Sequence, residues 1–212
     1  MDIARFKKLP VLGIIRGIEE DKLAPLIETI ISSGLETIEI TMNTPRAASL
    51  IKKAVKFANN KLTIGAGTVT DTQSLKNAID SGATFIVTPV LVEDVTSYCV
   101  KNKIPVFPGA LTPLEIFNAW RSGAAMVKVF PSGFFGPGYF KEIKGPFKDI
   151  ELLACGGVTP ENMKDYFASG ASAIAFGASV FRKEWLAKKD FAAVEDSIKR
   201  FVKSLAYLTI SF

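Results

Sequence analysis

The sequence predicts an α/β protein, a (β/α)8 TIM barrel formed by residues 1–212 as a single domain. Short β-branched, apolar runs alternate with longer amphipathic stretches along the whole chain. This alternation predicts a parallel sheet, because parallel strands need long crossover connections. Eight such units in 212 residues leave roughly 26 residues for each, close to the minimum for a strand–helix–strand repeat. Eight parallel strands of this kind close into a compact barrel.

The predicted strands and helices follow each other in order. The strands are the apolar runs at 11–16, 37–41, 62–66, 84–88, 106–108, 126–130, 151–155 and 173–176. Helical patterns lie between them at 22–33, 46–58, 73–80, 92–102, 113–121 and 161–168. Four of these helices end in a Ser-Gly pair just before a strand, at 33–34, 81–82, 122–123 and 169–170. Glycine at this position provides the left-handed backbone conformation that closes a helix.

A doubly wound open sheet is the alternative arrangement for the same alternation. It predicts a glycine-rich G-x-G-x-x-G turn after the first strand. The chain has Arg16-Gly17-Ile18-Glu19 at that place, which favours the barrel. In a barrel the reactive groups lie at the C-terminal ends of the strands. Charged residues in or just after the predicted strands are therefore the candidates for a site.

Composition excludes several classes of site. The chain has no histidine, which excludes a Ser-His-Asp triad and a zinc site that needs imidazole. Its two cysteines provide neither a disulfide framework nor a four-cysteine zinc site. The net charge of +5 favours anionic metabolites, and without a basic run it does not indicate a nucleic-acid partner. We expect no metal and no cofactor.

The hydropathy of the chain and its first ten residues indicate the cellular compartment to expect. No apolar run approaches the length of about 18 to 20 residues that a membrane span needs. The first ten residues mix acidic and basic side chains and contain no apolar signal core. We therefore expect a cytoplasmic protein that does not insert into membranes.

Lys128 is the strongest candidate for a reactive group. It is the only charged residue in the apolar segment 124–131, and strand alternation places it on the face opposite Val127 and Val129. If the valines face the helices, Lys128 points into the barrel. Burial disfavours the charged form of an amine, and a neutral amine attacks carbonyl carbons. A Schiff-base lysine, a lysine on an edge strand and a buried ion pair all remain open on this pattern.

Glu39 is the second candidate. In the alternating segment 37–41, Ile38 and Ile40 share one face and Glu39 lies on the other. An inward carboxylate beside an inward lysine suits proton transfer around an imine. The alternative is that Glu39 is an ion-pair partner without a catalytic role.

Two glycine-rich corners suggest a phosphate site. Gly156 and Gly157 follow the seventh strand, and Gly177 and Ser179 follow the eighth. In barrels this location commonly binds phosphate through backbone N–H groups and a helix N-terminus. Arg16 ends the first strand, which neighbours the eighth in a closed barrel, and adds positive charge there. Tight turns, and a surface ion pair for Arg16, are the alternatives.

These features together resemble the 2-keto-3-deoxy-6-phosphogluconate (KDPG) and 4-hydroxy-2-oxoglutarate (KHG) aldolase family, over nearly the whole chain. The family consists of lysine Schiff-base aldolases. The segments that carry the resemblance are Ile38-Glu39-Ile40-Thr41, Ile64-Gly65-Ala66-Gly67-Thr68-Val69, Phe107-Pro108-Gly109, Thr112-Pro113-Leu114-Glu115, Val127-Lys128-Val129-Phe130-Pro131 and Gly156-Gly157-Val158.

The resemblance implies a role for each matching residue. Lys128 matches the Schiff-base lysine and Glu39 the general acid and base. The residues that line the substrate site are matched by Thr68, Pro89 and Phe130, and the phosphate-binding corners by Gly156, Gly157, Gly177 and Ser179. The implied reaction is the cleavage of a 2-keto-3-deoxy-6-phospho sugar acid of the gluconate type to pyruvate and glyceraldehyde 3-phosphate. Whether 4-hydroxy-2-oxoglutarate is also cleaved stays open, and the implied assembly is a homotrimer.

Two substrate-contacting positions depart from the phosphogluconate pattern. Many members carry arginine where this chain has Asn43 and threonine where it has Cys155, so we expect substrate binding to differ here. The segments 16–18, 43–45, 130–132 and 155–162 resemble the 2-keto-3-deoxy-6-phosphogalactonate branch more closely. A phosphogalactonate aldolase is therefore the first alternative. An isomerase-type or non-catalytic phosphosugar-binding barrel is the second.

Overall fold

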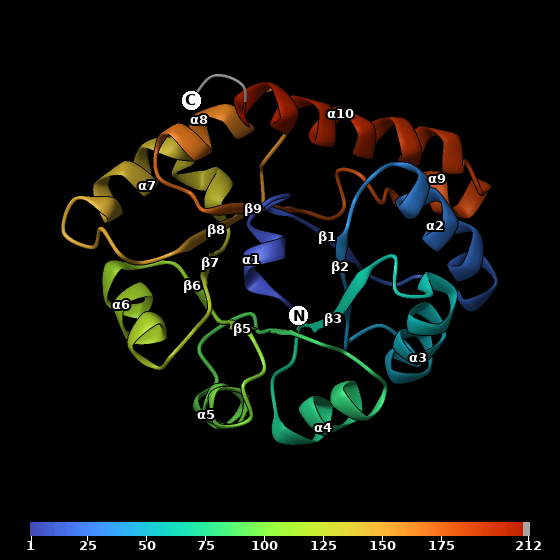
Figure 1. The fold of residues 1–212 in the computed structure, drawn as a ribbon, viewed down its shortest axis with the longest axis horizontal. Coiled ribbons are helices and arrows are strands. Elements are labelled where there is room, and N and C mark those ends of the chain that lie inside the picture. The colour runs from blue at the N-terminus through green and yellow to red at the C-terminus, as the bar shows by residue number, and fades with distance from the viewer. Residues whose placement is uncertain (210–212) are drawn as a thin grey trace.

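The computed structural model describes the backbone of residues 1–209 and the side chains of residues 1–205. The end of the predicted domain, at residue 212, lies outside the described residues. Figure 1 shows the strands at the centre of a ring of helices. All strand pairs are parallel, in the order β5-β4-β3-β2-β1-β9-β8-β7-β6. The predicted TIM barrel is confirmed.

The strands lie close to their predicted positions. They are β1 (Val11–Ile15), β2 (Thr37–Thr41), β3 (Thr63–Gly67), β4 (Ile86–Val87), β5 (Val106–Phe107), β6 (Gly109–Ala110), β7 (Val127–Val129), β8 (Leu152–Cys155) and β9 (Ala173–Phe176). The strand predicted at 84–88 is shorter, because Thr88 turns the chain by donating its hydroxyl to the carbonyl of Val90.

The fifth predicted strand, 106–108, ends at Phe107 as β5, and after Pro108 the chain forms a further short strand, β6, at the same position of the ring. Proline has no N–H to donate to the ladder, but its carbonyl accepts a hydrogen bond of 2.8 Å from the amide of Lys128. β5 pairs with β4 and β6 pairs with β7. The ring therefore has the eight strand positions expected, and the divided fifth position accounts for the ninth strand.

Helices cover the outside of this ring. They are α2 (Glu20–Ser32), α3 (Ala47–Ala58), α4 (Thr72–Asp80), α5 (Glu93–Lys101), α6 (Pro113–Arg121), α7 (Gly136–Lys144), α8 (Met163–Ala168), α9 (Lys183–Lys188) and α10 (Phe191–Thr209). Helix α6 begins with a capping box in which Thr112 and Glu115 satisfy each other's backbone amides. None of the described helices has the length and apolar character that a membrane span requires.

A short helix, α1 (Ile3–Phe6), closes the N-terminal end of the barrel, and it lies inside the ring in Figure 1. Its Phe6 ring stacks on Phe107, with the ring centroids 6.1 Å apart. Two ion pairs hold the helix in place, from Arg5 to Glu36 at 3.0 Å and from Lys7 to Glu151 at 2.8 Å. With this end closed, the C-terminal ends of the strands are left as the open end of the barrel.

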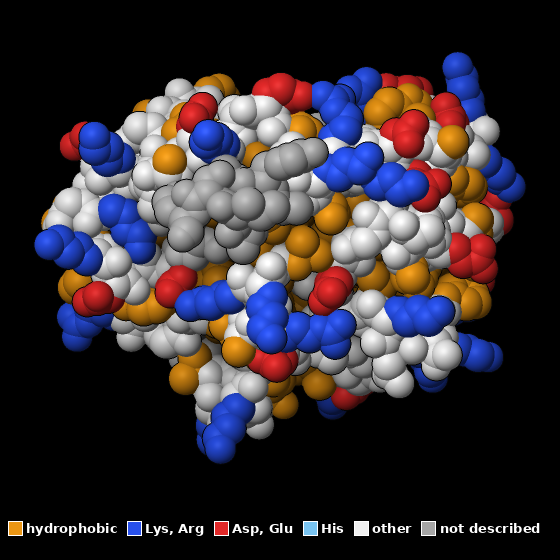
Figure 2. Space-filling model, turned by 45° about the horizontal axis from the view of Figure 1, so that its top comes forward, with side chains coloured by type: hydrophobic (Ala, Val, Ile, Leu, Met, Phe, Trp, Pro, Cys, Tyr) orange, Lys and Arg blue, Asp and Glu red, His pale blue; other side chains and the backbone are white. Residues whose placement is uncertain are grey.

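Two apolar clusters follow from strand alternation. One fills the space between strands and helices and includes Ile38, Ile40, Val127 and Val129. The other fills the barrel and includes Phe6, Leu12, Phe85, Phe107, Met126 and Leu153. On the face drawn in Figure 2, Lys and Arg side chains are spread among Asp and Glu side chains rather than gathered in one block.

Candidate active site

A cavity of about 590 Å³ opens at the C-terminal ends of the strands. The side chains and backbone that line it come from the ends of β1, β3, β4, β7, β8 and β9 and the turns that follow. The lining residues are Ile14, Arg16, Thr68, Pro89, Lys128, Phe130, Cys155, Gly156, Gly157, Val158, Ala175, Phe176, Gly177, Ala178 and Ser179. Ten of the twelve residues predicted for the site are in this set, and the other two are Glu39 and Asn43.

Lys128 projects from β7 into this cavity and is only 8% exposed. Its neighbours Val127 and Val129 are fully buried against the helices, so the predicted inward orientation is confirmed. The ammonium nitrogen lies 5.4 Å from the centre of the Phe130 ring. The surroundings of this amine are therefore apolar on one side and open to the cavity on the other.

Glu39 lies on the inner face of β2 and is 1% exposed. Burial raises the pKa of its carboxyl group, while the positive charges of Lys128 and Arg16 act in the opposite direction. Among the described residues, its Oε2 atom has no hydrogen-bond partner. A carboxyl group with a raised pKa and a free oxygen is suited to both accepting and returning a proton.

Cys155, at the end of β8, contributes a buried thiol to the cavity. Burial raises its pKa, and the nearby charge of Lys128 opposes this. The thiol is thus kept protonated, and it presents a compact, weakly polar surface beside the lysine.

The glycine corners lie side by side around the same cavity. Gly156 and Gly157 have left-handed φ angles of 88° and 84°, which a residue with a Cβ atom adopts only with strain. Gly177 and Ser179 follow β9, which pairs with β1, the strand that leads to Arg16. The Arg16 guanidinium donates a 3.3 Å hydrogen bond to the Thr68 hydroxyl. The glycine corners and the Arg16 guanidinium thus line a single space.

Ser132 is a residue of this region that the sequence analysis did not single out. It is 1% exposed, and its hydroxyl lies 3.0 Å from the carbonyl of Cys155 and 2.8 Å from that of Gly156. These contacts tie the turn η1 (Ser132–Phe134) to the glycine corner. Ser132 lies in the segment 130–132 that resembles the phosphogalactonate branch, but no local pattern indicates its contacts with the glycine corner.

Asn43 does not line the cavity. It is exposed in the turn that follows β2, the strand that carries Glu39.

The family described as KDPG and KHG aldolase matches residues 3–197 of this chain. The chain belongs to the KDPG and KHG aldolase family. It is 35% identical to 2-dehydro-3-deoxy-6-phosphogalactonate aldolase of Escherichia coli, over 82% of this chain and 86% of the relative. It is 32% identical to 2-dehydro-3-deoxy-phosphogluconate aldolase of Pseudomonas aeruginosa, over 92% and 89%.

Solved structures of related chains agree with this KDPG and KHG aldolase barrel. One described as native KDPGal has a TM-score of 0.88 and 33% identity and covers 94% of this chain and 96% of its own. A protein cage designed by fusing symmetric oligomeric domains has a TM-score of 0.88 and 32% identity, over 95% of this chain and 74% of its own.

Proposed function

We propose that this protein is a class I aldolase that cleaves a 2-keto-3-deoxy-6-phospho sugar acid of the gluconate type to pyruvate and glyceraldehyde 3-phosphate. The observation that carries the proposal is the amine of Lys128, buried in an apolar strand and facing a cavity with a buried carboxylate beside it. The names of the relatives support the same class of reaction.

Lys128 acts first, as the nucleophile. Its neutral amine attacks the C2 ketone of the substrate, and loss of water gives a protonated imine. The imine withdraws electrons from the neighbouring carbons, so this route needs neither a metal ion nor an organic cofactor. Phe130 and Cys155 line the space beside this centre.

Glu39 then transfers the protons. It removes the proton of the C4 hydroxyl, directly or through a water molecule, and the C3–C4 bond breaks to release glyceraldehyde 3-phosphate. The bonding electrons pass to the imine and leave an enamine on Lys128. Glu39 returns its proton to C3, and hydrolysis of the imine frees pyruvate and the amine.

The phosphate of the substrate is assigned to the glycine corners. Gly156, Gly157, Gly177 and Ser179 offer backbone amides and a hydroxyl at the edge of the cavity, and Arg16 adds a positive charge from the end of β1. Thr68 and Pro89 complete the wall that faces the sugar carbons. A phosphate held here directs the keto end of the substrate towards Lys128.

A specific observation supports the galactonate epimer as a second candidate substrate. The relative with 35% identity is a phosphogalactonate aldolase, and this chain has Asn43 and Cys155 at the two positions that depart from the phosphogluconate pattern. The chemistry at Lys128 and Glu39 is the same for both epimers, which differ at the C4 hydroxyl.

The test is to trap the imine. Borohydride added with pyruvate reduces the imine to a stable amine, and we expect mass spectrometry to find the added mass on Lys128. A label on another lysine, or none, would contradict the assignment. A pyruvate-release assay with both epimers separates an aldolase from an isomerase or a non-catalytic phosphosugar-binding barrel, neither of which releases pyruvate.

We also propose that the protein is a homotrimer assembled through an apolar rim at the open end of the barrel. The rim consists of Val90, Leu114, Phe130, Phe134 and Phe135, all of them large apolar side chains with substantial exposure, and Phe134 is 84% exposed. An apolar group of this kind on a protein surface commonly marks an interface. The related designed cage is built from symmetric oligomeric domains.

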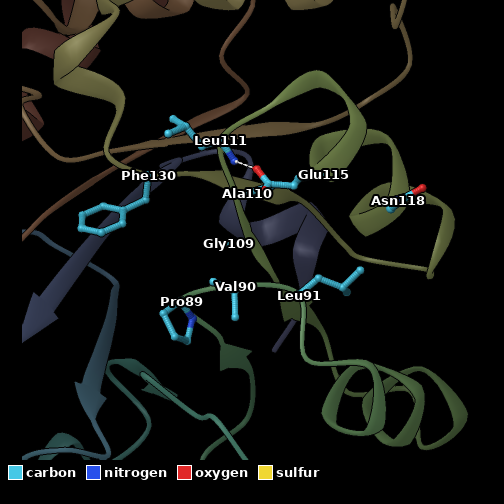
Figure 3. A pocket seen from close by; sticks show the side chains of 9 residues that line it. All are labelled: Pro89, Val90, Leu91, Gly109, Ala110, Leu111, Glu115, Asn118 and Phe130. Atoms are coloured by element: carbon cyan, nitrogen blue, oxygen red, sulfur yellow. Dashed lines mark hydrogen bonds between the residues drawn. The ribbon is translucent and has the colours of Figure 1, made fainter.

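A hollow of about 270 Å³ beside the rim offers a matching receptor (Figure 3). Its only charged lining group, the Glu115 carboxylate, already accepts hydrogen bonds from the amides of Leu111 and Thr112. An aromatic side chain of a second copy inserted here makes a head-to-tail contact, and such contacts form a ring when the rotation between copies closes. The hollow shares Pro89 and Phe130 with the catalytic cavity, so assembly supports one wall of the proposed active site.

We propose that the protein works in the cytoplasm, because both of its cysteines are free thiols. Cys99 and Cys155 are buried free thiols, as expected of a protein that works in a reducing compartment.

A further inference from the structure

Thr44 links two segments at the open end of the barrel. It lies in the turn after β2, is 3% exposed, and its hydroxyl oxygen accepts a 2.9 Å hydrogen bond from the amide of Gly17. The same oxygen is 3.0 Å from the hydroxyl oxygen of Thr41. An amide can only donate, so the Thr44 hydroxyl accepts the bond from Gly17, while either hydroxyl can be the donor in the pair with Thr41. Thr41 is fully buried, so water does not compete for this bond.

The segment that Thr44 holds is the one that carries Arg16. Strand β1 ends at Ile15, whose partner on β2 is Ile40. Beyond that pair the chain turns at Gly17, which has a left-handed φ of 68°. The bond to Thr44 therefore restrains the backbone just after Arg16, where the pairing of β1 with β2 has ended.

The position of Arg16 affects the proposed catalytic centre. Its guanidinium lines the cavity and bonds to Thr68 at 3.3 Å. Its charge also acts on the carboxyl group of Glu39. A turn that moved by an ångström would change the position of the cation that is offered to the substrate.

We propose that Thr44 is a positioning residue. Its hydroxyl ties the Arg16–Gly17 turn to the strand that carries Glu39. This bond holds the guanidinium of Arg16 at the mouth of the cavity, where it can bind the anionic end of the substrate. This inference rests on the proposed function. Thr44 itself does not line the cavity, and it acts through Arg16.

The experiment compares Thr44→Val, which keeps the shape and loses both hydrogen bonds, with Thr44→Ser, which keeps the hydroxyl. Thr96→Val is the matched control, because Thr96 is fully buried and its hydroxyl has no hydrogen-bond partner among the described residues. For Thr44→Val we expect KM for the phosphorylated substrate to rise about tenfold. This is the effect of losing about one hydrogen bond between Arg16 and the substrate. We expect kcat, and imine trapping with pyruvate alone, to stay within about twofold.

Thr44→Ser should restore KM, and Thr96→Val should leave it unchanged. Hydrogen exchange gives a readout that does not depend on activity, since the amides of the segment 16–18 should exchange faster in Thr44→Val and not in Thr44→Ser. An unchanged KM in Thr44→Val, or a parallel loss of kcat and of pyruvate trapping that serine does not rescue, would overturn the inference. If the wild-type protein cleaves neither epimer, the proposed function fails. The inference is then tested by calorimetry with inorganic phosphate. Weaker phosphate binding by Thr44→Val than by the wild type supports it, and equal binding contradicts it.

Discussion

The carboxylate of Glu39 occupies the space that a side chain at Gly67 would take. A Cβ atom built on Gly67 would lie 2.2 Å from Oε1 of Glu39, far inside van der Waals contact. The two residues come from the adjacent strands β2 and β3. Glycine at position 67 is therefore what allows the carboxylate to lie flat against the neighbouring strand, inside the barrel.

We predict that Gly67→Ala displaces this carboxylate and lowers kcat for aldol cleavage by about 10²-fold, the usual effect of misplacing a catalytic group by about 1 Å. Imine formation on Lys128 should persist, since the alanine methyl group meets Glu39. Steady-state pyruvate release and borohydride trapping measure the two effects separately. The control is Gly138→Ala, where a Cβ atom meets no atom within 4 Å. A Gly67→Ala enzyme with wild-type kcat would show that Glu39 does not need this placement.

Glu39→Gln should leave the cavity intact but remove the group that carries the proton. We predict a fall in kcat of about 10²- to 10⁴-fold, the usual contribution of general acid–base catalysis, while pyruvate still forms a trappable imine. Glu36→Gln is the control, because Glu36 lies on the surface and pairs with Arg5. Wild-type turnover in Glu39→Gln would reject the proposed role.

The raised pKa of Glu39 fixes the direction of the pH dependence. Glu39 must be ionised to accept the C4 hydroxyl proton, so activity is present above its pKa and lost below it. Because burial raises that pKa, the acid limb of kcat/KM should lie at higher pH than for an ordinary glutamate of about 4.3.

Arg16 acts in the opposite direction on the same group, since its charge lowers the pKa of Glu39. In Arg16→Met this opposing effect is lost, and the acid limb should move to still higher pH. Arg16→Lys keeps the charge, and its limb should stay close to that of the wild type. A pH profile of kcat/KM for the three proteins measures the shift. An acid limb that moves to lower pH in Arg16→Met would contradict the electrostatic argument.

Strand alternation was enough to predict the inward side chains of the site. Val127 and Val129 flank Lys128, and Ile38 and Ile40 flank Glu39. In each case the apolar pair packs against helices and leaves the charged residue on the inner face. A parallel strand in a barrel has one face towards the helices and one towards the axis, so once the barrel is predicted the pattern indicates which side chains point inward, although it leaves their roles open.

Elements that depend on distant contacts were not predictable in this way. Helix α7 begins with Gly136 and Gly138, which are typical of a loop, and it is held by Phe140, whose ring meets Tyr166 edge-on at 5.3 Å. Helix α1 has four residues, too few to be stable without tertiary packing. The hydrogen bonds of Ser132 join turns more than 20 residues apart in sequence, and no local pattern marks such pairs.

The proposed role of the apolar rim leads to a prediction about the oligomeric state. Phe134→Asp should convert the proposed trimer into monomers in light scattering, because burying a second carboxylate in a hollow that is already lined by the Glu115 carboxylate has a large cost. Phe57→Asp is the control, since Phe57 is a 44% exposed aromatic side chain on α3, outside the rim. A monomeric wild-type protein, or a Phe134→Asp protein that remains trimeric, would contradict the proposed interface.

Asn43 supplies the test of substrate choice. It lies in the exposed turn after β2, outside the cavity lining, and an arginine there adds a longer side chain with a positive charge. A guanidinium offers two parallel donors to carboxylate or hydroxyl oxygens, which an asparagine at this distance does not. We therefore predict that Asn43→Arg raises kcat/KM for the gluconate-derived substrate relative to the galactonate-derived one by about tenfold, or about 1.4 kcal/mol of transition-state binding.

The measurement is pyruvate release from each epimer under the same conditions. The control is Asn102→Arg, which makes the same substitution at an exposed position directly after α5, at the end of the barrel opposite the cavity, and should change neither the ratio nor the rate, because distant exposed charges are screened by salt. If Asn43→Arg leaves the ratio of the two substrates unchanged, position 43 does not contact the sugar. The choice of epimer would then lie with side chains that line the cavity, among which Cys155 is the remaining departure from the phosphogluconate pattern.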